Sequence, residues 1–153
     1  MKAERRFFLF FLLFSTLGAF SQVWAGPTIH IKIKTLLASQ NAGPSSPRIK
    51  SLTKEYQSVL RYSSYKLLSQ NRLNLNLNES GRVSLPGNRT LKITPKGISG
   101  NRASLELVIF KKNRKKNRKI FQTVVQLRNK SSITVGGPKY RDGNLLFNIF
   151  NSF

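Results

Sequence analysis

The segment Leu73-Asn74-Leu75-Asn76-Leu77-Asn78 alternates leucine and asparagine without exception. Strict alternation of apolar and polar residues is typical of a β-strand with one buried face, because successive side chains of a strand point to opposite sides. The same period recurs nearer the N-terminus, over Thr28–Leu37, in the sequence TIHIKIKTLL. Both segments therefore predict half-buried strands.

Other short apolar segments follow, separated by turn-forming Gly, Pro, Asn and Asp, as in the turns Pro86–Asn88 and Gly97–Asn101. We predict further strands over Tyr65–Ser69, Arg82–Leu85, Thr90–Thr94, Ser104–Phe110, Lys119–Leu127, Ser132–Val135 and Asn144–Phe150. About eight short strands at this spacing predict a mainly β fold, either an antiparallel sandwich or a partly open barrel. Aliphatic and aromatic residues at alternate positions are expected to form its core, namely Leu105, Leu107, Ile109, Phe121, Val125, Leu127, Leu145, Phe147 and Ile149.

One segment has the period of a helix. Ser46 precedes Pro47, which is the order of an N-cap and a first helical residue. Apolar residues then recur every three or four positions up to Arg61. We predict one amphipathic helix, Pro47–Arg61, which makes the fold class α+β.

The first 25 residues have the organisation of a secretory signal. Lys2, Arg5 and Arg6 precede an almost wholly apolar segment over Phe7–Phe20, and Val23-Trp24-Ala25 has the form of a cleavage motif. We expect cleavage after Ala25 and a single β-rich domain over residues 26–153. The alternative is a retained membrane anchor, although the apolar segment is shorter than the ~20 residues that span a bilayer.

The composition excludes several kinds of chemistry. The chain has 153 residues, 27 Lys and Arg against 5 Asp and Glu, a formal net charge of +22, one His and no Cys. Without cysteine there is no disulfide, thiolate metal site or cysteine nucleophile. A single histidine excludes a metal site built from several imidazoles. We therefore expect no cofactor and no metal.

Few residues beyond the signal could act in catalysis. His30 lies on the polar face of its strand, and the carboxylates are Glu55, Glu79, Glu106 and Asp142. A triad would require His30 to lie near Asp142 and a serine, and no nucleophile-elbow motif supports it. The scattered carboxylates are better explained as ion-pair partners of the many cations. We expect a protein that is not an enzyme.

The strongest functional feature is a basic run between two apolar strands. Its sequence, KKNRKKNRK, is expected to form an exposed hairpin tip whose like charges favour a polyanionic partner. The candidate polyanion-binding residues are Lys111, Lys112, Arg114, Lys115, Lys116, Arg118 and Lys119. The candidate partners are lipopolysaccharide, anionic lipid head groups, teichoic acid and glycosaminoglycan. Nucleic acid is disfavoured, because no stacking platform of aromatic residues accompanies the run. The competing interpretation is a solvated loop in a chain with a basic composition.

The C-terminal segment suggests one further alternative. Leu145, Phe147, Ile149 and Phe153 share one parity, as in the last strand of an outer-membrane β-barrel. Asn151 interrupts that parity, and most predicted strands are shorter than the ~9–11 residues that a transmembrane strand needs. We favour a last strand packed in a sheet.

Three stretches carry a resemblance to known sequences: Tyr62–Leu68 (YSSYKLL), Leu85–Leu91 (LPGNRTL), and Val135–Pro138 (VGGP) followed by Asp142–Leu146 (DGNLL). Together they resemble a group of small exported bacterial β-rich proteins of uncharacterised function. The resemblance implies a periplasmic or extracellular β domain and no particular chemistry.

These observations predict an exported, non-enzymatic binding or envelope-associated module. Its expected contact is electrostatic, through the basic hairpin, with a polyanionic surface. The alternative is a protein-interaction subunit of a larger envelope assembly, followed by the small outer-membrane barrel.

Overall fold

The computed structural model describes residues 26–40, 62–113 and 116–153. The predicted signal and the predicted helix Pro47–Arg61 lie outside these residues. The described residues form eight strands: β1 (Ile29–Ser39), β2 (Ser64–Leu75), β3 (Gly81–Leu85), β4 (Arg89–Ser99), β5 (Arg102–Lys112), β6 (Asn117–Arg128), β7 (Ser131–Tyr140) and β8 (Gly143–Ser152).

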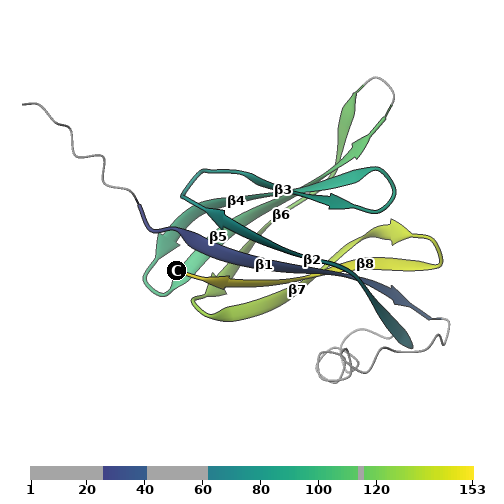
Figure 1. The fold of residues 1–153 in the computed structure, drawn as a ribbon, viewed down its shortest axis with the longest axis horizontal. Coiled ribbons are helices and arrows are strands. Elements are labelled where there is room, and N and C mark those ends of the chain that lie inside the picture. Colours follow the sequence, from purple (N-terminus) through teal and green to yellow (C-terminus); the bar gives the residue numbers. More distant parts are fainter. Residues whose placement is uncertain (1–25, 41–61, 114–115) are drawn as a thin grey trace, which may run out of the picture.

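The strands form two antiparallel four-stranded sheets. Sheet A has the order β2-β1-β8-β7, and sheet B has the order β3-β4-β5-β6. Figure 1 shows them as two layers, with sheet B above sheet A. The mainly β prediction is confirmed in its sandwich form, because the described strands make two sheets instead of one closed barrel.

The main core lies between the two sheets, and a second, smaller cluster buries Leu36, Ala38, Tyr65 and Leu146. Strand β1 contributes Ile29, Ile31 and Ile33, each at most 2% exposed, and β8 contributes Leu145, Phe147 and Ile149, each fully buried. Sheet B covers them with alternate residues of its own strands, namely Val83, Leu85, Leu91, Ile93, Leu105, Leu107, Ile109, Val125 and Leu127. Burial of one such side chain contributes about 1.5–3 kcal/mol, so this alternation specifies the packing of the layers.

Two predicted strands are one in the structure. The segments Tyr65–Ser69 and Leu73–Asn78 are predicted as separate strands, yet β2 runs from Ser64 to Leu75, and residues 76–78 lie beyond its end, in the following turn. The residues between them are polar because β2 is an edge strand, where Gln70 and Arg72 are exposed. Polar residues at an edge interrupt the apolar pattern without interrupting the strand.

One predicted turn and the first half of another lie inside strands. Gly136-Gly137-Pro138 was predicted to end a strand, whereas β7 continues to Tyr140 with a register shift between Gly136 and Lys139. The edge position of β7 tolerates proline because no further strand needs its missing N–H. Similarly, β4 runs to Ser99 through the first half of the predicted turn Gly97–Asn101, with a register shift between Pro95 and Gly97.

The C-terminal alternation belongs to an interior strand. Strand β8 pairs with β1 on one side and β7 on the other. Leu145, Phe147 and Ile149 face the core, as predicted, and Asn151 is fully buried on the same parity. No helix in the described part of the chain is long and apolar enough to cross a membrane.

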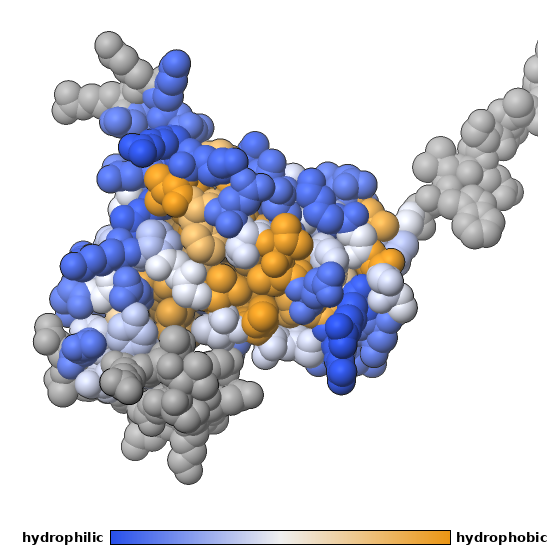
Figure 2. Space-filling model, turned by 180° about the vertical axis from the view of Figure 1, so that it is seen from behind, coloured by the Kyte–Doolittle hydropathy of each residue, from blue (hydrophilic) through white to orange (hydrophobic). Residues whose placement is uncertain are grey.

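Apolar side chains also occur on the surface. Seen from behind, the molecule has an exposed band of hydrophobic residues between hydrophilic margins (Figure 2). The large hydrophobic residues with the greatest exposure are Leu67, Ile120 and Val124, the last at 57%. Two of them, Ile120 and Val124, belong to the edge strand β6.

Candidate polyanion-binding surface

The basic run forms the far end of the β5–β6 hairpin. The predicted loop is shorter than expected, because Lys111 and Lys112 end β5 while Arg118 and Lys119 lie near the start of β6. The Asn113 amide donates to the Lys116 carbonyl oxygen over 3.1 Å. We call this end of the hairpin, whose described residues are 111–113 and 116–119, the β5–β6 arm. Figure 1 shows the arm extending beyond the neighbouring strands. The cations are therefore presented on a β-ribbon with a defined register.

Five of the seven predicted binding residues are described, and all five are exposed: Lys111, Lys112, Lys116, Arg118 and Lys119. Arg114 and Lys115 lie outside the described residues. Among the described residues, none of the five cations forms an ion pair with a carboxylate. The Lys119 ammonium instead donates to Gln122 Oε1 over 2.6 Å. The charge of the arm is thus available to an external anion.

A groove at the base of the arm extends the basic surface onto the outer face of sheet B. It has a volume of about 600 Å³. Two arm residues, Lys112 and Asn117, line it together with Arg82, Thr90, Lys92 and Phe110. We call this the sheet B groove. Arg82 and Lys92 were not among the predicted binding residues, because neither lies in a charge cluster of the sequence.

The strand register places cations directly opposite one another in five places. The pairs are Lys32 with Arg72, Arg82 with Lys92, Arg89 with Lys111, Arg102 with Arg128, and Lys111 with Arg118. Like charges at directly opposed positions destabilise a sheet, and a bound anion relieves their repulsion. Repulsion within these pairs therefore lowers the stability of the sheets, and a bound polyanion would reduce that repulsion.

One carboxylate lies on the same face of sheet B. Glu106 forms an ion pair with Lys96 at 3.3 Å and accepts a hydrogen bond from Gln122 Nε2 at 2.9 Å. The hydrogen bond from Lys96 is the largest cause that lowers the pKa of Glu106 below its ordinary value, and Gln122 and the nearby Lys92 lower it further. Glu106 is thus held ionised, pairs with Lys96 and also attracts Lys92 of the groove.

The catalytic candidates do not converge. His30 pairs with Ser152 at one end of sheet A, and its Nδ1 lies 2.9 Å from Asn74 Oδ1. Asp142 accepts a hydrogen bond from Ser39 Oγ at the other end, over 3.0 Å. The length of β1 between these positions is about 30 Å at the usual rise of a strand. A triad that contains His30 and Asp142 is therefore excluded by the geometry.

Metal-ligating groups are also dispersed. Within the described ranges, no three His, Cys, Asp or Glu side chains are grouped so that they could hold a metal ion. Glu79 accepts a hydrogen bond from the Asn76 amide and closes the turn after β2. The described acidic residues therefore act in turns and in one ion pair.

Comparisons with known proteins show no family for this chain. No protein-family model matches it, and a search of curated proteins gives no match. Among solved structures, the T2SS secretin XcpQ from Pseudomonas aeruginosa aligns at 14% sequence identity with a TM-score of 0.38. The alignment covers 82% of this chain and 55% of the secretin chain, so the chain spans little more than half of that protein's length. A likeness at this level carries no functional argument.

Proposed function

We propose that this protein is an exported, non-enzymatic module that binds polyanions through the β5–β6 arm and the sheet B groove. The observation that carries the proposal is the position of the basic run. It lies on an extended ribbon whose five described cations have no carboxylate partner among the described residues. Export is the expectation from the signal-like N-terminal sequence.

The sheet B groove gives the basic surface a concave site next to the arm. A polyanion that follows the arm meets the opposed pair Arg82 and Lys92 at its base, next to the ring of Phe110. Several cations along one path release several counterions, which makes binding strongly dependent on salt. The proposal therefore predicts tight binding at low ionic strength and rapid loss as salt is added.

The test is a variant in which Lys111, Lys112, Lys116 and Arg118 are replaced by glutamine. Binding to immobilised heparin is measured over a series of salt concentrations. The slope of log affinity against log salt should become shallower by about 3, since each phosphate-like contact contributes ~0.7–0.9 to the slope. A matched control replaces Lys66, Arg102, Arg128 and Lys130, four exposed cations outside the arm and groove.

The two variants have the same net charge, so a general loss of charge affects them equally. The proposal requires the arm variant to lose far more affinity than the control. Equal losses of affinity in the two variants would mean that binding depends on net charge alone and not on the arm. That result, or unchanged binding by the arm variant, would overturn the proposal.

A second candidate function is a protein-interaction subunit of an envelope assembly. It is favoured by Ile120 and Val124, which are exposed on the edge strand β6. An open edge with apolar side chains is suited to pairing with a strand of another protein. Binding of that kind withstands high salt, whereas the electrostatic contact does not, so a high-salt wash separates the two functions.

A further inference from the structure

The outer face of sheet A carries a second basic groove. It has a volume of about 480 Å³ and lies over β1, β2 and β8. Its cations are Lys32 and Arg72, which occupy directly opposed positions on β1 and β2. The Lys32 ammonium lies 5.9 Å from the centre of the Phe150 ring. We call this the sheet A groove.

The remaining side chains of the sheet A groove suit an anion. The Asn74 amide nitrogen and the Ser152 hydroxyl are hydrogen-bond donors, whereas His30 Nδ1 is engaged with Asn74 Oδ1 at 2.9 Å. No aspartate or glutamate lies among the described residues that line the groove. Both cations therefore lack a carboxylate in the groove, and a bound anionic group would relieve the repulsion between them.

The two grooves have corresponding chemistry. Each contains one opposed cation pair, one phenylalanine, one asparagine and one hydroxyl residue. These are Lys32, Arg72, Phe150, Asn74 and Ser152 on sheet A, and Arg82, Lys92, Phe110, Asn117 and Thr90 on sheet B. The sheet B groove has a third cation, Lys112, and the sheet A groove also has His30 and Ile31. The correspondence arises on different strands with no repeat in the sequence, which favours one kind of ligand for both grooves.

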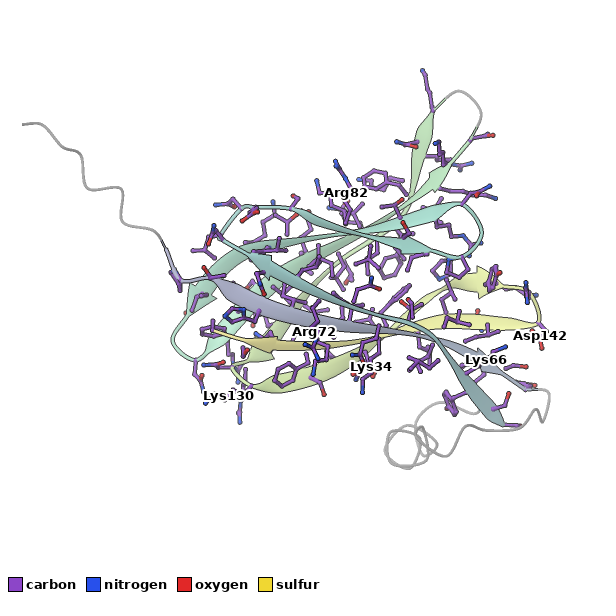
Figure 3. All side chains as sticks on the ribbon, viewed as in Figure 1. Lys34, Lys66, Arg72, Arg82, Lys130 and Asp142 are labelled. Carbon is purple, nitrogen blue, oxygen red and sulfur yellow. The ribbon has the colours of Figure 1, made fainter. Side chains whose placement is uncertain are left out.

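The grooves face in opposite directions. Figure 3 shows Lys34 and Arg72 on the side of sheet A and Arg82 on the side of sheet B. The core fills the space between the sheets, which pack ~10 Å apart. Two grooves that face apart cannot both contact one flat membrane surface. They can, however, each hold a segment of a flexible chain.

We propose that the protein is bivalent and bridges two chains, or two segments, of an anionic polysaccharide. In each groove the cation pair would hold an acidic group, and the phenylalanine ring would pack against the apolar face of a sugar ring. A single ring in each groove suits an isolated sugar better than single-stranded nucleic acid, which stacks successive bases on several aromatic residues. The inference rests on the proposed function of the sheet B groove and adds a second site to it.

The test is the stoichiometry of a short heparin oligosaccharide, measured by titration calorimetry on the full protein. The wild type should bind two oligosaccharides. Lys32→Gln with Arg72→Gln should bind one, and Arg82→Gln with Lys92→Gln should also bind one. The matched control is Arg102→Gln with Arg128→Gln, which removes an opposed cation pair that lines neither groove and should leave two sites.

A second readout tests bridging itself. Wild-type protein should cluster beads coated with heparin, and each groove variant should bind the beads with at least tenfold less clustering. Thermal denaturation of every variant shows whether it is folded. If a groove variant is folded and binds one oligosaccharide fewer, the loss is due to the replaced groove residues and not to unfolding.

The possible failures are distinguishable. One site in the wild type, unaffected by replacing Lys32 and Arg72, would overturn bivalency and leave the proposed function standing. Loss of all binding in the sheet A variant, with no effect of the sheet B and arm variants, would overturn the proposed function instead. Tighter binding of a single-stranded DNA of equal charge would overturn the polysaccharide as the ligand.

Discussion

Along its first half, over residues 29–34, the two sides of strand β1 have opposite chemistry. The side toward sheet B carries Ile29, Ile31 and Ile33, and the other side carries His30, Lys32 and Lys34. The isoleucines are at most 2% exposed, while His30 is exposed and the two lysines are partly exposed. Over these residues the inner side determines stability, and the outer side can accumulate cations because it is open to water. Further along β1 the outer side is itself apolar, since Leu36 and Ala38 are buried in a second cluster with Tyr65 and Leu146. Replacements on the two sides should separate folding from binding.

The largest effect is expected on the inner side, from Phe147→Ala. Phe147 is fully buried at the centre of sheet A, and its loss leaves a cavity that costs about 3–5 kcal/mol of unfolding free energy. Denaturation in urea measures this loss. The control is Phe150→Ala, three residues along the same strand but partly exposed in the sheet A groove, which should cost about 1 kcal/mol or less. Equal costs would contradict the assignment of inner and outer sides.

A smaller effect of opposite sign is expected from Thr35→Val. Thr35 is fully buried on β1, and its Oγ1 has no hydrogen-bond partner among the described residues. Valine has nearly the same shape and removes an unsatisfied hydroxyl, so the unfolding free energy should rise by about 1 kcal/mol. Thermal denaturation checks the sign. A loss of stability would mean that the hydroxyl has a partner in the folded protein.

The third expected effect is on the outer side, where stability and binding should change in opposite directions. Arg72→Gln removes the repulsion with Lys32 and should raise the unfolding free energy by about 0.2–1 kcal/mol. The same replacement should weaken oligosaccharide binding in the sheet A groove. The control Arg72→Lys keeps the charge and should change stability less. If Arg72→Gln lost both stability and binding, the opposed cations would not be a strain that the ligand relieves.

The smallest expected effect depends on pH. The pKa of Glu106 is lowered in the folded protein from an ordinary value of 4.5, chiefly by its hydrogen bond from Lys96. A lowered pKa means that the ionised carboxylate contributes stability above the ordinary value, and that this contribution is lost as pH falls through the folded-state pKa. Glu106→Gln should therefore flatten the decline of Tm below about pH 4.5. An unchanged decline would exclude Glu106 as its source.

The same inner and outer distinction explains how much of the fold could be predicted. Alternation in β1 and β8 identified their buried faces, because both strands lie inside sheet A with an apolar row toward the core. In β2 it identified only Leu73 and Leu75, because Asn71 and Ser69 pair with the inward Ile33 and Thr35 and are themselves polar. It failed in β7, whose edge position accommodates Pro138. An edge strand can carry polar residues and proline, which protect its open side from pairing with another chain.

The candidate surface was predicted where its residues are consecutive. The basic run of the arm is visible as a charge cluster in the sequence. The cation pairs of the two grooves are not, because Lys32 and Arg72 come from different strands and become neighbours through the register alone. No period or motif marks such a pair. Pairing of the strands must be known before the grooves can be recognised.

The most direct test of the central claim is the affinity of the wild-type protein for heparin as a function of salt, with uncharged dextran as the control. The protein should not bind dextran, and its log affinity for heparin should fall linearly and steeply with log salt. Binding to heparin that is unchanged between low and high salt, or equal binding to dextran, would contradict an electrostatic function of the outer faces.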